Sequence, residues 1–286
     1  QDATILYIDD YLFTDADGNN DMPKERDQKQ FYRNALAGYA FAEWDNDVQG
    51  VPVLADLAGI EVIVWCADSE IGTADGNYRL WYDIGAEGGG VLKEFMDGGG
   101  KLLLTGTQTL GYMYDSNPPA SDAFESEYLG VSDSLIIDVV DTTWWLDDVA
   151  HDTLIVTPDS VTADTSYEET WFNEWWLTWV MKDSETTLDL PDSMKIDVAK
   201  QGDQDDYCSG MTFLRNDATV TTEPIFRWGL WVDGSAPAAP YYESIIGHIT
   251  SWSGEPVSAM LNFDTYSMPP DGIRQTFVTI LTEFGQ

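Results

Sequence analysis

The stretch Gly98–Tyr112, GGGKLLLTGTQTLGY, has the form of a buried strand that breaks into a sharp turn. Enzymes of the α/β class often place a Ser or Cys nucleophile on such a turn. Here the turn carries Thr105, Gly106, Thr107 and Gln108 instead. A threonine hydroxyl such as that of Thr107 needs an adjacent base before it can attack a substrate, and none is visible in the sequence. We therefore expect an elbow that keeps its shape and has lost its chemistry.

An acidic loop near the N-terminus, DDYLFTDADGNND, is the best candidate for a metal site. Oxygen-bearing side chains alternate in it at Asp15, Asp17, Asn19 and Asp21. This spacing lets one turning loop supply several of the roughly six to eight oxygen ligands that Ca²⁺ takes. The match to the EF-hand signature is partial, because Arg26 stands where the bidentate Glu belongs. The alternative is a solvated acidic turn; if Ca²⁺ binds, we expect its role to be structural.

Carboxylates also follow two of the expected strands. Asp9 and Asp10 end the first strand, and Asp68 and Glu70 follow the third. The carboxyl ends of parallel strands meet at one edge of the sheet, where α/β proteins bind ligands. Paired carboxylates there could carry out acid–base hydrolysis. The alternative is that they cap helices and solvate the surface.

Aromatic residues concentrate in WFNEWWLTWVM, which contributes Trp171, Trp175, Trp176 and Trp179. Three roles are open for them: a core for this part of the chain, a platform on which sugar rings stack, or a subunit interface, where Trp is enriched. Exposed indoles in such number are a liability unless a partner chain covers them. On the interface interpretation we expect a homo-oligomer or a filament, favoured at high salt.

The chain has two cysteines, Cys66 and Cys208. If the protein is exported, a disulfide between them would close a long loop, worth about 4–5 kcal/mol in the chain-entropy model. Cys66 also lies in an apolar strand, where a small buried thiol packs well without any chemical role. Both alternatives stay open at this point.

Short apolar runs predict the strands that would position these groups: TILYID, FAEWD, EVIVWC, KLLLTG and, near the C-terminus, VSAMLNFD. Helical spacing is present in QKQFYRNALAGYAF, in GGVLKEFMDGGG and in DGIRQTFVTILTEFG, where Asp271 is the expected N-cap. Strands that alternate with helices predict a parallel sheet covered on both faces.

The middle of the chain has a different pattern. From about Leu135 to Trp252 there are short β-rich runs with many Thr, Asp and Trp residues. We interpret this region as an insertion in an α/β body. The expected division is 1–134 for the first part of the body, 135–240 for the β-rich, Trp-rich insertion and 241–286 for the closing strand and helix. The stretch Ser235–Ser244, SAPAAPYYES, is expected to be a linker back to the body.

The chain resembles the class I glutamine-amidotransferase-like domain of exported bacterial proteins through six runs in order: ILYIDD, FYRNALAGYAFAEWD, AGIEVIVWCAD, VLKEFMDGGGKLLLTGTQ, FESEYLGV and RQTFVTILTEFG. The resemblance covers most of residues 3–130 and 241–286. It implies a flavodoxin-like α/β fold, a parallel sheet with helices on both faces. Active members carry a G-x-C-x-G turn with a distant His and Glu. This chain has TGTQTLG there, and neither His151 nor His248 lies in a matching motif.

Charge restricts the class of partner. The chain has 51 acidic and 13 basic residues, a net charge of −38. Nucleic acids and anionic membranes would be repelled, because binding them requires Lys and Arg at the phosphates. The acidic surface fits either a saline habitat or bound cations. No apolar run approaches the roughly 20 residues of a membrane span.

These observations together predict a protein that is secreted or lies at the cell surface. The chain begins with Gln1 rather than Met, which fits removal of an export signal or of a tag. The expected function is non-catalytic, structural or adhesive, through self-association or through binding to a polysaccharide or cell surface. The alternative is a hydrolase that uses acidic residues at the carboxyl edge of the sheet.

Overall fold

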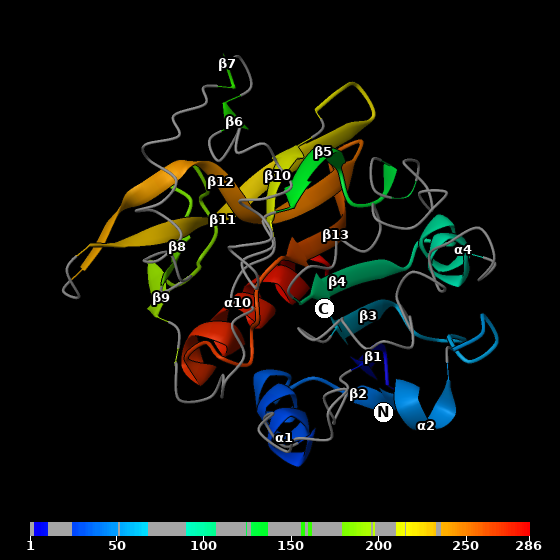
Figure 1. The fold of residues 1–286 in the computed structure, drawn as a ribbon. Coiled ribbons are helices and arrows are strands. Elements are labelled where there is room, and N and C mark those ends of the chain that lie inside the picture. Colours follow the sequence, from blue (N-terminus) through cyan, green and yellow to red (C-terminus); the bar gives the residue numbers. More distant parts are fainter. Residues whose placement is uncertain are drawn as a thin grey trace, which may run out of the picture.

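A nine-stranded sheet in the order β2-β1-β3-β4-β13-β12-β11-β8-β9 runs through the protein, seen in Figure 1 as a computed structural model. The structure describes residues 3–10, 25–50, 52–67, 90–106, 124, 127–136, 156–157, 160–161, 179–195, 197, 210–214, 216–232 and 236–286.

One half of the sheet is parallel. Its strands are β1 (Ile5–Asp10), β2 (Phe41–Asp45), β3 (Val62–Ala67), β4 (Lys101–Thr105) and β13 (Glu255–Leu261). These are the strands that the apolar runs predicted. Strand β3 is apolar on both faces because both faces are covered, and its described side chains are all buried. The sheet therefore has the mainly parallel centre of an α/β fold.

The other half is antiparallel and continues the same sheet. It consists of β12 (Ala236–Trp252), β11 (Val220–Val232), β8 (Trp179–Lys182) and β9 (Ser193–Lys195). The expectation of a linker at Ser235–Ser244 is wrong, because the chain from Ala236 onward forms the first half of β12. Alternating Pro and Ala residues indicated a linker, but a strand at the end of a long hairpin tolerates Pro where no ladder hydrogen bond is needed.

Two small sheets lie outside the main one. Strand β5 (Val131–Ile136) pairs with β10 (Gly210–Leu214), and β6 (Val156–Thr157) pairs with β7 (Ser160–Val161). Both pairs are antiparallel, as expected for a region of short β-rich runs.

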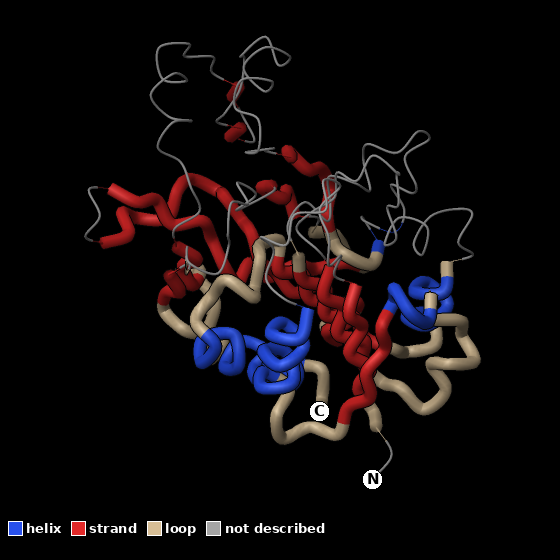
Figure 2. The backbone as a smooth tube through the Cα atoms, turned by 60° about the horizontal axis from the view of Figure 1, so that its bottom comes forward, coloured by secondary structure: helices blue, strands red, loops and turns tan. Residues whose placement is uncertain are grey.

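Helices cover the two faces of the parallel half, as Figure 2 shows from below. On one face α1 (Glu25–Ala35) and α10 (Pro270–Glu283) pack on Tyr7, Val64 and Leu103. On the other face α4 (Val91–Asp97) packs on Ile8, Trp65 and Leu104. A single turn, α2 (Asn46–Gln49), follows β2. The described residues contain no helix long and apolar enough to cross a membrane.

Two helix ends differ from the sequence expectation. Helix α1 ends at Ala35, before Tyr39, because the chain turns at Gly38, whose φ of 113° is unfavourable for other residues. Helix α10 begins at Pro270 with Pro269 at the N-cap, so Asp271 lies in the first turn, where its charge still suits the helix dipole.

Side chains of β12 and β13 bind the backbone of the segment before β5. The carbonyl of Leu129 accepts from His248 Nε2 at 2.7 Å and from Thr250 Oγ1 at 2.8 Å, and the carbonyl of Tyr128 accepts from Ser258 Oγ at 2.5 Å. Burial lowers the pKa of His248 to about 4, so the imidazole is neutral near pH 7 and donates from Nε2. These side chains thus supply hydrogen-bond donors to the carbonyl groups of Tyr128 and Leu129.

Gly130 allows this close approach. It has φ +69°, and a Cβ there would lie 2.3 Å from Thr222 Cγ2 and 2.7 Å from Thr250 Oγ1. We predict that Gly130→Ala lowers the free energy of unfolding by about 2–5 kcal/mol, because the left-handed backbone costs about 1–2 kcal/mol and overpacking about 1–3 kcal/mol more.

The matched control is Gly254→Ala. Gly254 also has positive φ, +87°, but a Cβ there would meet nothing within 4 Å. Only the cost of the left-handed backbone then remains. Urea denaturation should therefore give a clearly smaller loss in the free energy of unfolding. Equal losses for the two variants would show that the contact at Gly130 is not tight.

Candidate functional site

Four polar residues form a row across the carboxyl edge of the parallel half-sheet. Asp45 of β2 pairs in register with Asp9 of β1, Asp9 with Cys66 of β3, and Cys66 with Thr105 of β4. Side chains alternate between the faces of a strand, so residues in register lie on the same face. The face is that of α1 and α10, because Tyr7 and Val64, two positions earlier, pack there. This row is the place where an α/β protein would carry its chemistry.

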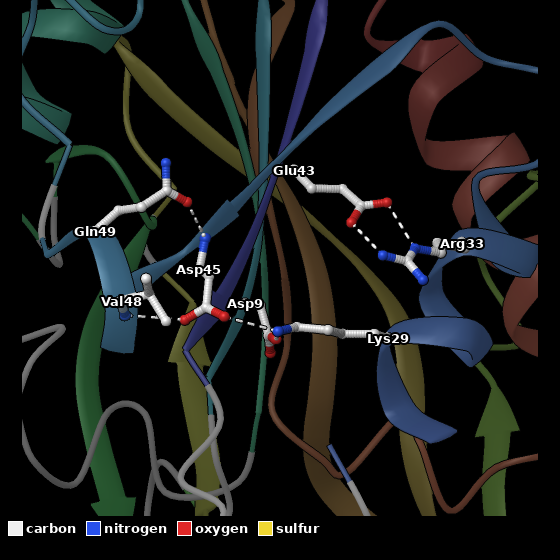
Figure 3. A network of polar contacts seen from close by, with 7 residues as sticks. All are labelled: Asp9, Lys29, Arg33, Glu43, Asp45, Val48 and Gln49. Atoms are coloured by element: carbon white, nitrogen blue, oxygen red, sulfur yellow. Dashed lines mark hydrogen bonds and ion pairs between the residues drawn. The ribbon is translucent and has the colours of Figure 1, made fainter. Parts of the chain in front are cut away.

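The two carboxylates of the row share one ammonium group (Figure 3). Lys29 Nζ of α1 lies 3.2 Å from Asp9 Oδ2 and 2.7 Å from Asp45 Oδ2. Asp9 is only 6% exposed and Lys29 18%, so water screens the pair weakly. A buried carboxylate is costly unless a counter-charge accompanies it. Lys29 supplies that charge here.

Asp45 has a second task. Its Oδ1 accepts a hydrogen bond from Val48 N at 3.1 Å, and Gln49 Oε1 accepts one from Asp45 N at 2.8 Å. These are the reciprocal bonds of an N-cap, and they start α2 directly after β2. The carboxylate of Asp45 is thus occupied by a cap on one oxygen and by Lys29 on the other.

One turn further along α1, a second ion pair joins the helix to β2. Arg33 Nε and Nη2 each donate to the carboxylate of Glu43 at 2.6 Å. These bonds lower the pKa of Glu43 and raise that of Arg33. The side chains are 42% and 37% exposed, so the pair is worth little, about 0–1 kcal/mol.

The other two residues of the row are hydroxyl and thiol groups in a buried chain of hydrogen bonds. Tyr32 OH of α1 lies 2.8 Å from Thr265 Oγ1, and Thr265 Oγ1 donates to Thr105 Oγ1 at 3.4 Å. Cys66 is buried beside this group, in register with Thr105. Burial raises the pKa of the Cys66 thiol and of Tyr32, so both stay neutral. A neutral thiol is a poor nucleophile.

The elbow begins where the sequence predicted it. Thr105 is the last residue of β4, and Gly106 follows with φ 151° while its N–H donates to the carbonyl of Leu261 at 3.1 Å. The Thr105 hydroxyl is buried among Tyr32, Thr265 and Cys66. Thr107 and Gln108 lie outside the described residues.

Histidine does not complete a catalytic set in the described part of the chain. His248 is buried on β12 and bonds to the carbonyl of Leu129. Its imidazole therefore acts as a hydrogen-bond donor to the backbone, and its pKa of about 4 keeps it neutral. His151 lies outside the described residues.

Several other expectations also lie outside the described residues: the calcium ligands Asp15, Asp17, Asn19 and Asp21, the carboxylates Asp68 and Glu70, the aromatic residues Trp171, Trp175 and Trp176, the side chains of Asp10 and Trp179, and Cys208. Within the described ranges no group of three or more His, Cys, Asp or Glu residues could hold a metal ion. Cys66 is a free buried thiol, so a disulfide with Cys208 has no support from the residues described.

Sequence reasoning found Asp9, Cys66 and Thr105 but missed Asp45, the fourth residue of the row. It also missed Lys29, which pairs with Asp9 and Asp45, and Tyr32, which bonds to Thr265 beside Thr105. A signal was present: Lys29 is one of only 13 basic residues in the chain, and it lies three positions before Tyr32 on a predicted helix. Residues three or four apart lie on the same face of a helix. If Tyr32 faces the sheet, Lys29 therefore faces it too.

Comparison with known proteins gives few matches. No model of a known family and no curated protein matches the chain. A solved structure from Bacteroides uniformis, described as a ThuA-like protein, is 12% identical with a TM-score of 0.48, over 99% of this chain and 92% of that one. PurLQS from Thermotoga maritima is 13% identical with a TM-score of 0.41, over 99% of each chain. Likenesses at these scores say nothing of the chemistry of this chain.

We predict that Lys29→Met lowers the free energy of unfolding by about 3 kcal/mol, the low end for breaking a buried pair, because Asp9 loses this counter-charge while Asp45 keeps some contact with water. Arg33→Met, which removes the exposed pair on the same helix, should cost about 0–1 kcal/mol. Adding Asp9→Asn to Lys29→Met should restore part of the loss. Equal costs for the two single variants, measured by urea denaturation, would contradict this role of Lys29.

Proposed function

We propose that this chain is a non-catalytic structural or adhesive protein built on an amidotransferase-like, flavodoxin-like scaffold. The observation that supports it is the occupied row at the carboxyl edge: Lys29 pairs with both Asp9 and Asp45, and Thr105 and Cys66 are buried. An active site needs groups that face a substrate with a perturbed pKa suited to its task. The groups of this row instead bind Lys29 and Thr265 or are buried.

The strand order supports the flavodoxin-like part of the proposal. The parallel strands follow β2-β1-β3-β4-β13, the order 2-1-3-4-5 of flavodoxin-like folds. Thr105 then stands at the end of the strand that precedes the nucleophile turn in the resembled family. The alternative function, a hydrolase at this edge, is less favoured because Asp9 is paired with Lys29.

The elbow should be catalytically silent. We expect a fluorophosphonate probe to leave residues 105–108 unlabelled, since the Thr105 hydroxyl is buried and no base contacts it among the described residues. Peptide mass spectrometry after incubation of the native chain would check this, with a serine hydrolase as positive control for the probe. A covalent adduct on the turn would contradict the non-catalytic part of the proposal.

The adhesive part of the proposal is self-association. A net charge of −38 makes copies repel one another at low ionic strength. At about 1 M salt the Debye length falls to about 3 Å, and apolar contacts such as those of Trp175 and Trp179 can then hold copies together. We expect sedimentation velocity to give an oligomer at about 1 M NaCl and a monomer at about 0.01 M. A monomer under both conditions would refute it.

We also propose that Asp15, Asp17, Asn19 and Asp21 bind Ca²⁺ and that the chain is secreted or lies at a cell surface, where Ca²⁺ is abundant and a polysaccharide could be a partner. A ligand that binds only the native state raises its stability. The melting temperature should therefore rise in millimolar Ca²⁺ and fall again with a chelator. The double variant Asp15→Asn/Asp17→Asn should lose this shift in melting temperature. A wild-type melting temperature that does not change with Ca²⁺ would contradict the proposed site.

A further inference from the structure

Helix α1 carries a polar side chain in the middle of its buried face. Gln28 is only 2% exposed, and it shares that face with Phe31, Tyr32 and Ala35, which follow it at helical spacing and are buried as well. The amide oxygen of Gln28, Oε1, has no hydrogen-bond partner among the described residues. A polar atom buried in this way costs free energy unless some group bonds to it.

A second polar group of this kind lies on strand β1, which α1 covers. The side chain of Tyr7 is 1% exposed, and its hydroxyl has no hydrogen-bond partner in the part of the chain that the structure describes. Burial raises the pKa of Tyr7 well above its usual value, and the neighbouring Cys66 and Asp9 raise it further. The phenol therefore stays protonated, and its O–H remains a donor that needs an acceptor.

The two groups lie in the same interface, between α1 and β1. Tyr7 belongs to the apolar cluster under α1, and its ring centroid is 5.5 Å from that of Tyr32. Lys29 of the same helix reaches Asp9, two positions after Tyr7 and on the same face of the strand. Gln28 is adjacent to Lys29 and one helical turn from Tyr32, so it lies in the turn of α1 that covers this end of β1.

The chemistry of the two groups selects what can bond to both. The amide oxygen of Gln28 only accepts hydrogen bonds, whereas the Tyr7 hydroxyl can donate one. A metal cation could not accept from a phenol O–H, and an anion is disfavoured beside Asp9, whose charge acts on Tyr7. Water is neutral, donates and accepts, and in protein interiors typically makes about three bonds to polar groups that lack a protein partner.

We propose that one buried water molecule bridges the Tyr7 hydroxyl and Gln28 Oε1 in the interface between α1 and β1. The water accepts a hydrogen bond from the phenol and donates one to the amide oxygen. The bridge is a second polar link between this helix and this strand, besides the ion pair of Lys29 with Asp9. It goes beyond the proposed function, since it requires neither self-association nor a silent elbow.

Urea denaturation of Tyr7→Phe tests the bridge by the sign of its effect. If a water bonds to the hydroxyl, the variant should lower the equilibrium constant for folding by about two- to tenfold. If the hydroxyl is buried without any partner, its removal should raise that constant instead. Tyr32→Phe is the matched control, because the Tyr32 hydroxyl lies 2.8 Å from Thr265 Oγ1 and the variant loses a bond that the structure shows. It should lower the constant by a similar factor.

The variant Gln28→Met and its combination with Tyr7→Phe test whether one molecule serves both groups. Changes at two residues that share a partner are not independent. The double variant should therefore lose at least about threefold less than the product of the two single losses. Losses that simply multiply would show that the two groups have separate partners, and would overturn the shared bridge.

A high-resolution crystal structure of the unmodified chain gives the direct readout and does not depend on any variant. We expect an ordered water at about 2.7–3.0 Å from both Tyr7 Oη and Gln28 Oε1. A direct hydrogen bond between the two side chains would overturn the inference. So would an interface without a water at this place, or a Tyr7→Phe variant that is more stable than the wild type.

Discussion

A single ammonium group holds together the edge of this sheet where α/β proteins carry their chemistry. Lys29 bridges Asp9, which is almost fully buried, and Asp45, which caps α2. Without a counter-charge at this point, a buried carboxylate would lie at the end of β1. The bridge links α1 to β1 and to β2, while the other carboxylate oxygen of Asp45 caps α2. In a chain with 51 acidic and 13 basic residues, one of the few cations is placed at this edge.

The same arrangement limits what the edge can do. Each of the four residues in the row is occupied or buried: Asp45 and Asp9 by an ion pair with Lys29, Thr105 by a hydrogen bond from Thr265, and Cys66 by burial. Groups that satisfy one another stabilise the fold, but they do not present a charge or a nucleophile to a substrate.

Much of this fold could be predicted from the sequence. Runs such as EVIVWC and KLLLTG are apolar throughout because parallel strands are buried on both faces, and this signal is local. The register that brings Asp45, Asp9, Cys66 and Thr105 into one row is not local, since it depends on which strands become neighbours. The first half of β12 was missed for a related reason: Pro237 and Pro240 disfavour a strand locally, and pairing with β11 outweighs that preference. The role of Lys29 followed from the helix period, but only once α1 was known to lie over β1 and β2.

The central claim is that the carboxyl edge is closed by its own side chains, and the reactivity of Cys66 tests it most directly. In a Cys208→Ser variant, Cys66 is the only thiol of the chain. If the edge is closed, a disulfide reagent reaches the thiol only through unfolding. The rate of modification should then rise with urea in proportion to the unfolded fraction, with the slope of global unfolding. A rate that is fast and independent of urea below the transition would mean that the native edge is open to a small molecule, and would contradict the account.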